Sequence, residues 1–277
     1  MFPLFNAEGT TMMRTSDFPR FACRAKSRLR RLLAGVATAL ACLPVAAQSV
    51  DDLVFITEDY PPFNFERDGR RLGIAVDVLE EMLVQAGAKK TRADIRVWPW
   101  ARGYETALKE KNTVLFSTTR TEAREHLFKW VGPIMPSRIV LVAKKQRAIQ
   151  IKSADHLKQS AYKIGVVRED IGGQLLANLG VNKDRTVQAN SGVSVAKMLQ
   201  ADRVDMWAYG APVIMWNLKE LGYPADAYEE VFTLTESQHY YYAVNKETDD
   251  KLVEKLQSAL EQVKAKGRFN AIIARYR

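Results

Sequence analysis

The chain has 277 residues and a formal net charge of +9 at pH 7. No segment is low in complexity and none repeats at a solenoid period, which excludes repeat architectures. After the first 47 residues there is no polybasic tract with interleaved aromatic residues, so the charge pattern argues against nucleic-acid binding.

The N-terminal segment has the pattern of a secretory signal peptide. A basic cluster at residues 24–31 precedes an apolar run at 32–45, and Val45 and Ala47 suit cleavage after Ala47. The apolar run is too short for a lasting membrane span. Residues 1–47 are therefore expected to be removed on export to the periplasm, and an alternative is a lipid anchor at Cys42, because Ala39-Leu40-Ala41-Cys42 is similar to a lipobox.

Removal of this leader changes what the composition implies. It would leave 230 residues, with a net charge of +4 because the leader carries five net positive charges. Both cysteines, Cys23 and Cys42, belong to the leader, so no disulfide is expected and stability must come from burial. A chain of this length can form one large core or two smaller ones, and two are expected.

The first half of the remaining chain alternates strand and helix patterns. Strands are expected at 53–57, 95–98 and 114–116, and helices at 74–83 and 102–109. Pro61 and Pro62 end the first strand. Gly87 ends the first helix.

The second half repeats this alternation, which predicts a second α/β unit. Overall the order predicts an α/β fold with mainly parallel strands. The expected strands are 139–143, 163–167, 186–188, 204–208 and 240–244, and the expected helices are a short one at Leu157, then 172–179, 193–200, 211–221 and two after 252 that are separated by Gly267.

Polar side chains that suit an anion follow the expected strand at 114–116. Thr119 lies at its end, and Thr121 to Arg124 is expected to form an N-cap and a first helical turn. A guanidinium can bind a carboxylate through two parallel hydrogen bonds, which a lysine cannot. The alternative is that Arg124 is a surface residue paired with Glu122 or Glu125.

Several short motifs, taken in order, resemble the periplasmic solute-binding proteins of family 3, the polar amino-acid type of ABC-transporter receptor. The resemblance covers essentially the whole chain after the leader. The motifs are Tyr60-Pro61-Pro62-Phe63, Gly73 with Asp77, Ala107-Leu108, Thr119 to Arg124, Phe128 to Pro133, Ile164-Gly165-Val166, Arg203-Val204-Asp205 and Gly267 to Asn270.

The resemblance implies a type II binding-protein fold, in which two α/β lobes close about a hinge on a ligand. Lobe 1 would comprise 48–136 and 240–277, and lobe 2 would comprise 139–237. The crossing segments would lie near 135–138 and 238–240. The resemblance places Tyr60 where the family stacks an aromatic ring on the ligand, and Thr119 and Arg124 where it holds a carboxylate.

Two departures from the family pattern concern the ligand's amine. The late strand ends in Tyr209-Gly210, where amino-acid-binding relatives have an acidic acceptor for an ammonium group. The loop that opens the second lobe's site is Arg168 to Ile171 instead of Gly-Thr or Gly-Ser. Either Asp170 or Glu58 replaces the missing acceptor, or the ligand has no amine.

Aromatic residues cluster at the expected strand ends, where ligands bind in open α/β sheets. Each could instead belong to a lobe core. Among them Trp100 and Tyr209 are expected to line the ligand site, and Phe63 is expected in the loop core. The cluster consists of Trp98, Trp100, Tyr104, Trp207 and Tyr209.

Catalytic and cofactor motifs are missing from the sequence. His126, His156 and His239 are far apart and have no cysteine partner, so no metal or cofactor is expected. The expected protein is a monomeric, non-enzymatic receptor that binds a small carboxylated solute between two lobes and delivers it to an inner-membrane ABC permease. The alternatives are an enzyme of the same fold, similar to cyclohexadienyl dehydratases, and a solute-sensing partner of a membrane receptor.

Overall fold

The computed structural model describes residues 48–276 of the chain, the folded unit. The expected signal peptide, its cleavage site and Cys42 lie outside the described residues. Among the described residues, no helix combines the length and the apolar character needed to cross a membrane.

One sheet of eight strands runs through the unit, in the order β4-β1-β5-β10-β6-β9-β7-β8, and a separate hairpin pairs β2 with β3. The strands are β1 Val54–Thr57, β2 Phe65–Arg67, β3 Arg70–Leu72, β4 Arg96–Val97, β5 Thr113–Thr119, β6 Phe128–Lys144, β7 Ile164–Val167, β8 Thr186–Ala189, β9 Met206–Gly210 and β10 Tyr228–Asn245.

The expectation of mainly parallel strands is wrong for the middle of this sheet. Strand β1 pairs in parallel with β4 and β5 at one end, and β7 pairs in parallel with β8 and β9 at the other. Between them, β10 is antiparallel to β5 and to β6, and β6 is antiparallel to β9. The strand-helix alternation predicts the two parallel ends of the sheet. The first half of the unit is the part around β1, β4 and β5, and the second half is the part around β7, β8 and β9; strands β6 and β10 run through both.

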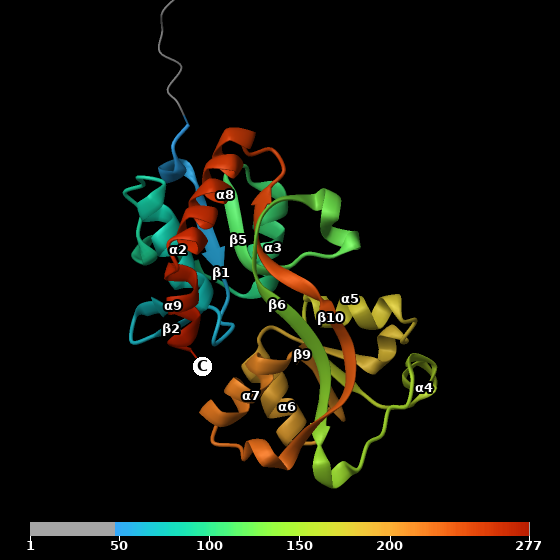
Figure 1. Cartoon of the computed structure of the whole chain (residues 1–277). Coiled ribbons are helices and arrows are strands. Elements are labelled where there is room, and N and C mark those ends of the chain that lie inside the picture. The colour runs from blue at the N-terminus through green and yellow to red at the C-terminus, as the bar shows by residue number, and fades with distance from the viewer. Residues whose placement is uncertain (1–47, 277) are drawn as a thin grey trace, which may run out of the picture. The chain divides into compact units, whose positions relative to one another are not determined.

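These two strands connect the halves of the unit. The expected strands at 139–143 and 240–244 are only parts of β6 and β10, which pair from Phe128↔Asn245 to Lys144↔Tyr228. Figure 1 shows them side by side along the length of the unit. The two expected crossing segments lie within these strands and pair with each other, since Ser137 pairs with Gln238 and Met135 with Tyr240.

Helices cover the sheet in both halves (Figure 1). Helices α2, α3, α8 and α9 lie with β1, β4 and β5, whereas α4 to α7 lie with β7, β8 and β9. Their bounds are α2 Ile74–Gln85, α3 Trp100–Lys109, α4 Ala154–Gln159, α5 Ile171–Asn178, α6 Gly192–Gln200, α7 Ala211–Glu220, α8 Asp250–Ala265 and α9 Arg268–Ala274, and the 3-10 helices are η1 Val50–Asp52, η2 Arg92–Asp94, η3 Glu122–Leu127, η4 Lys145–Arg147, η5 Lys183–Arg185 and η6 Ala225–Ala227.

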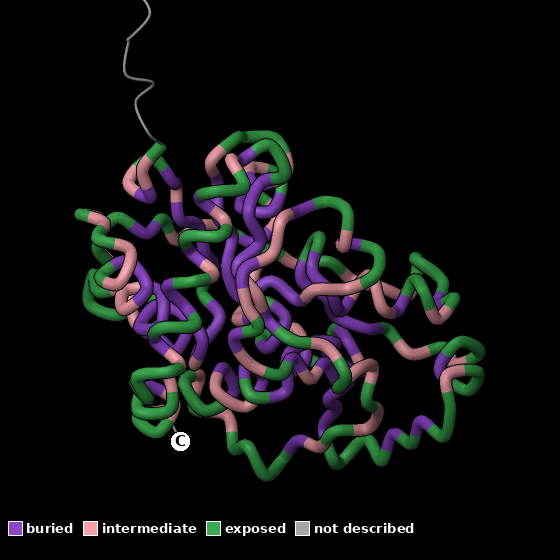
Figure 2. Tube along the Cα trace, turned by 45° about the horizontal axis from the view of Figure 1, so that its top comes forward, coloured by how far each residue is buried: buried purple, intermediate pink, exposed green. Residues whose placement is uncertain are grey.

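The described residues form two hydrophobic clusters: a large one that spans both halves, and a smaller one in the second half around Leu157, Ile164 and Met206. One buried cluster contains Phe55 and Leu79 of the first half together with Leu199 and Trp207 of the second. Figure 2 shows the buried segments inside the unit and the exposed ones around them. The aromatic residues at the boundary between the halves therefore belong to the same packed interior as the two sheet ends.

The chain end is held against the first half by polar contacts. The Tyr276 hydroxyl donates to Asp77 Oδ2 at 3.0 Å and accepts a hydrogen bond from the Gly73 amide at 3.0 Å. Arg92 and Arg275 each form an ion pair of 3.1 Å with the same buried carboxylate. The segment after α9 is thus fixed to the N-terminal end of α2.

Candidate functional site

Polar and aromatic side chains from both halves meet at one boundary, where strands β1, β5 and β9 end. Five of the six sequence-predicted residues are buried to within a few per cent of full burial: Tyr60, Trp100, Thr119, Arg124 and Tyr209. Asp170, the sixth, is 6% exposed.

Arg124 lies at the centre of this site. Its side chain is 1% exposed, so the alternative of a solvated surface ion pair is wrong; Arg120, four residues earlier, is the residue that pairs with Glu125. Nη1 donates to the Thr119 carbonyl and Nη2 to the Glu169 carbonyl, both at 3.3 Å. The buried Nε has no hydrogen-bond partner among the described residues. The guanidinium therefore keeps donor capacity for an additional acceptor.

The surroundings of Arg124 leave it charged. Burial lowers the pKa of its guanidinium, and the nearby Tyr104 and Asp170 act in the opposite direction. Because a guanidinium does not lose its proton in proteins at physiological pH, the group stays a cation. Its Cζ atom lies 5.0 Å from the centre of the Tyr104 ring and 5.6 Å from that of Trp100. These rings hold the cation in a site from which water is excluded.

Trp100 connects the two halves. It is the first residue of α3 in the first half, and its Nε1 donates to the Glu169 carbonyl of the second half at 2.8 Å. Glu169 has a left-handed backbone with φ of +60°. This unusual conformation is typical of functional loops in which the surrounding contacts fix the backbone. Trp100 and Arg124, both from the first half, thus donate to the same carbonyl of the second half.

Aromatic rings form a wall beside these contacts. Tyr60 packs edge-to-face against Tyr209 with ring centres 5.0 Å apart, and its hydroxyl is 2.9 Å from that of Tyr240. Phe63, which was expected in the loop core, stacks on Tyr60 with ring centres 5.8 Å apart and so also contacts this wall. A Cβ atom at Gly210 would lie 2.2 Å from the Tyr60 hydroxyl, so the wall closes only because residue 210 has no side chain.

The expectation at Thr121 is corrected in one respect. Thr121 occupies the N-cap position, but the helix that follows is the short 3-10 helix η3, and the Thr121 side chain makes no capping hydrogen bond. No α-helix N-terminus therefore points at the site from this segment. The Thr119 hydroxyl makes a hydrogen bond to another strand instead of capping a helix: its Oγ1 is 2.9 Å from Ser137 Oγ on β6.

Two buried carboxyl groups, those of Glu58 and Asp170, come from opposite halves to the same boundary. Glu58 follows β1 in the first half, and Asp170 is the N-cap residue of α5 in the second. The Tyr209 hydroxyl donates to Glu58 Oε2 at 3.4 Å, and the Gly172 amide donates to Asp170 Oδ2 at 3.5 Å. Both distances are long for hydrogen bonds to a charged acceptor.

The same pair has perturbed acidity. Burial raises the pKa of the Glu58 carboxyl well above its ordinary value, and the charge of Asp170 raises it further. Burial also raises the pKa of Asp170, against the opposing effect of Arg124. The tyrosines around the pair stay neutral because burial raises the pKa of Tyr60 and Tyr209 well above 10 and that of Tyr240 to about 12.

Sequence reasoning did not identify some residues of the site. Tyr240 and Ser137 were assigned only to crossing segments, and the role of the Glu169 carbonyl depends on its positive φ, for which the sequence has no glycine signal. Tyr104 appeared only as one aromatic among several. Its position one helical turn after Trp100 is the signal that would have placed it beside Arg124.

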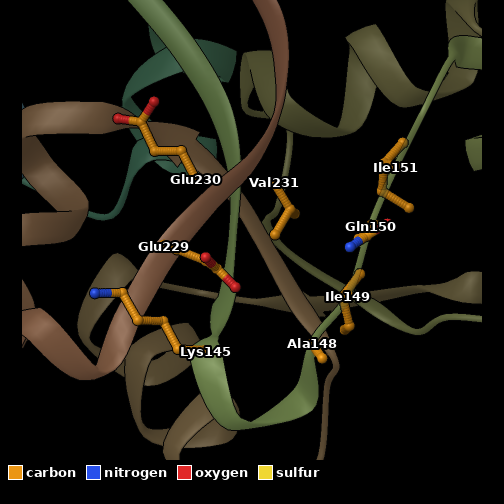
Figure 3. A pocket seen from close by; sticks show the side chains of 8 residues that line it. All are labelled: Lys145, Ala148, Ile149, Gln150, Ile151, Glu229, Glu230 and Val231. Atoms are coloured by element: carbon orange, nitrogen blue, oxygen red, sulfur yellow. The ribbon is translucent and has the colours of Figure 1, made fainter.

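Of the hollows on the described surface, one of about 240 Å³ is lined by Glu169 and Asp170 together with residues of β7 and α5. One of about 500 Å³ lies between β10 and residues 148–151, as Figure 3 shows, and none of the candidate residues lines it. Another, of about 480 Å³, lies between the halves and is lined by Thr121 and Ala123 on one side and by residues of α5 on the other. Within the described residues, no three His, Cys, Asp or Glu side chains are grouped in a way that could hold a metal ion.

A family model described as bacterial extracellular solute-binding proteins, family 3, matches residues 53–277. A probable histidine-binding protein of Campylobacter jejuni subsp. jejuni serotype O:2 is 22% identical over 224 residues, which are 79% of this chain and 81% of that protein.

Solved structures show the same fold. An ancestral arginine-binding protein bound to arginine has a TM-score of 0.68 at 22% identity, covering 81% of this chain and 98% of that one. An ABC uptake transporter substrate-binding protein from Streptococcus pneumoniae with bound histidine has a TM-score of 0.69 at 19% identity, covering 81% and 92%. A histidine kinase sensor domain with similarity to periplasmic binding proteins has a TM-score of 0.71 at 19% identity, covering 81% and 95%.

Proposed function

Because the chain belongs to the bacterial extracellular solute-binding proteins of family 3, we propose that it is a receptor that encloses a small carboxylated solute between its two lobes, with Arg124 binding the carboxylate. The observation that carries the proposal is the buried guanidinium of Arg124 at the lobe boundary, whose Nε has no partner within residues 48–276 and whose two hydrogen bonds to backbone carbonyls are long. A carboxylate that accepts two N–H groups is the ligand for which this geometry is best suited.

Ligand binding and lobe closure are coupled in this proposal. The groups around Arg124 come from both lobes, since Thr119 belongs to the first and Glu169 and Asp170 to the second. A ligand that contacts both lobes stabilises the closed arrangement over the open one. The lobes separate to admit the solute and close on it about the long strands β6 and β10.

Delivery and location complete the proposal. The protein is exported by its N-terminal signal peptide, remains a monomer and passes the solute to an inner-membrane ABC permease. A deletion strain is expected to lose uptake of the bound acid. A strain that retains uptake but loses its transcriptional response to that acid would instead support a role as a sensor partner, like the kinase sensor domain with the same fold.

A binding screen tests the central claim. Thermal shifts with amino acids, keto acids, dicarboxylates and aromatic acids, each compared with its uncharged amide or alcohol, are expected to show stabilisation by at least one acid and not by its uncharged analogue. An equal thermal shift with an acid and with its uncharged analogue would refute the proposed role of Arg124. After prolonged incubation the bound acid is expected to be recovered unchanged, whereas a new product would favour the dehydratase-like alternative.

A further inference from the structure

The surface beside the candidate site carries two arginines that stack on one tryptophan. Trp98 follows strand β4 and is half-buried, while Arg96 and Arg102, before and after it in the chain, are exposed. The Cζ atom of Arg102 lies 3.9 Å from the centre of the Trp98 ring, and that of Arg96 lies 5.4 Å from it. Both guanidinium groups are therefore within the range of cation-π contacts with the same side chain.

Neither of these two charges is neutralised within the described part of the chain. Among residues 48–276, the guanidinium groups of Arg96 and Arg102 form no ion pair and no hydrogen bond, and the acids closest to them in the sequence have other partners. Asp94 accepts a hydrogen bond from the amide that precedes η2, and Glu105 pairs with Lys109 at 2.6 Å. The N–H donors of both arginines are therefore available to an anion from outside this chain.

The platform under these charges is fixed to the first half. The Trp98 amide donates to the Thr57 carbonyl of β1 at 2.8 Å, and the Arg102 amide donates to the N-cap carbonyl of α3 at 3.0 Å. A Cβ atom at Gly103 would lie 3.1 Å from side chains of β1 and β5, so the first turn of α3 packs closely on the sheet. An anion that binds here meets donors whose backbone is already in place, which lowers the entropic cost of binding.

The stack also lies next to the boundary between the halves. Pro99 alone separates Trp98 from Trp100 in the chain. The Trp100 indole in turn donates to the Glu169 carbonyl of the second half at 2.8 Å. A partner bound to the stack is therefore adjacent to the boundary that opens, in the proposed function, when the solute is released.

We propose that the stack of Arg96 and Arg102 on Trp98 is the docking site for an acidic segment of the membrane protein that receives the solute. Carboxylate side chains of that segment bind the edges of the two guanidinium groups, while the indole ring holds their planes. This inference rests on the proposed function, because it gives the chemistry of the partner to which the solute is delivered. It uses none of the residues proposed to hold the solute.

The charge distribution favours a protein segment over an anionic membrane surface. Adsorption to anionic lipid requires clusters of several basic residues, because each of them contributes little. Here two guanidinium groups stand on one ring, and the chain after the leader has no polybasic tract. Two fixed, planar charges suit paired carboxylates better than a diffuse layer of lipid head groups.

Fluorescence anisotropy with a labelled hexaglutamate peptide at low ionic strength tests the site. The double substitution Arg96→Gln with Arg102→Gln is expected to weaken peptide binding about tenfold or more, since it removes charge-assisted hydrogen bonds from two groups. The matched control, Arg67→Gln with Arg268→Gln, removes the same charge from arginines that are 48% and 58% exposed and already paired with glutamates. Its loss is expected to stay below about threefold. An equal loss in the two double variants would indicate attraction by net charge alone and overturn the site.

The substitution Trp98→Leu separates the platform from the charges. Leucine keeps both arginines and an apolar side chain but removes the ring on which they stack, so peptide affinity is expected to fall about threefold. Urea unfolding of the same variant checks that it is folded. Native affinity in a folded Trp98→Leu protein refutes the role of the ring.

Vesicles distinguish a protein segment from a membrane surface. The protein is expected to sediment no more with vesicles of phosphatidylglycerol than with vesicles of phosphatidylcholine. Sedimentation with the anionic vesicles that is lost in the Arg96→Gln with Arg102→Gln variant would assign the stack to the membrane and overturn the protein segment.

Uptake by cells separates docking from solute binding. In a deletion strain, the Arg96→Gln with Arg102→Gln protein is expected to restore about tenfold less uptake of the bound acid than the native protein, because docking weakens by that factor, while the purified variant binds the acid with native Kd. Native uptake with this variant overturns the docking site. If no acid binds the native protein, the proposed function fails, and the peptide titration still decides whether the stack holds an acidic segment.

Discussion

Replacement of Arg124 by lysine is the most direct test of carboxylate binding. The substitution keeps one positive charge in the same buried place but removes the planar pair of donors. Arg124 has N–H groups beyond the two that bond to the Thr119 and Glu169 carbonyls at 3.3 Å, and its Nε has no partner in the described part of the chain. A lysine ammonium has three donors and would have to satisfy the same carbonyls before it reached the ligand.

The expected loss follows from this donor count. Lysine keeps the charge and loses one of two charge-assisted hydrogen bonds to the ligand, which is about 1.5 to 3 kcal/mol, or about 10- to 150-fold in Kd. Alanine loses both bonds and leaves the buried Asp170 without its nearest cation, so its effect is expected to be larger. The assay is titration calorimetry with an acid identified by the thermal-shift screen.

Arg120→Lys provides the matched control. Arg120 precedes η3 on the same segment, but its side chain is 36% exposed and pairs with Glu125. Exposed pairs of this kind contribute little, so ligand Kd is expected to change by less than about threefold. An unchanged Kd in a folded Arg124→Lys variant, or an equal loss in Arg120→Lys, would refute the assignment of the carboxylate to Arg124.

Four further substitutions test the packing around the site and the anchoring of the chain end. A Cβ atom at Gly172 would lie 2.6 Å from a backbone carbonyl oxygen of β9, so Gly172→Ala is expected to lower the free energy of unfolding by about 1 to 3 kcal/mol, measured by urea unfolding. Gly173→Ala is the control: its nearest contact would be at 3.8 Å, so the free energy of unfolding should be unchanged or higher. Tyr276→Phe removes the hydrogen bond to buried Asp77 and is expected to cost about 1 kcal/mol in the same assay; no change would contradict the anchoring of the chain end. Trp100→Phe removes one interlobe hydrogen bond of 2.8 Å and is expected to weaken every ligand by a similar factor of about 2 to 12, while a loss confined to one ligand would indicate direct contact instead.

The sequence predicted the parallel ends of the sheet because their signals are local. Short β-branched runs followed by helical periodicity define β1 with α2 and β7 with α5. The long strands β6 and β10 were not predicted, because they are half-buried, carry β-bulges that shift the register, and depend on each other for pairing. Only the tertiary arrangement shows that two crossing segments are one antiparallel ribbon.

The site shows the same division between local and distant information. Arg124 and Tyr60 carry motif signals, and the structure places both at the lobe boundary. Tyr240 lies 180 residues from Tyr60, and their hydroxyl contact depends on the long strand β10. That Glu58 and Asp170 are both buried and close enough for the charge of Asp170 to raise the pKa of Glu58 is also a product of tertiary structure, since the two residues are far apart in the sequence.

The groups that hold the closed unit together are also those proposed to bind the ligand, and this sets the energetics of binding. Arg124 and Trp100 both donate to the Glu169 carbonyl, which favours closure. A ligand carboxylate that Arg124 binds between the lobes adds to these contacts. Such a ligand binds the closed state better than the open one, because groups of both lobes surround Arg124 only when the lobes meet.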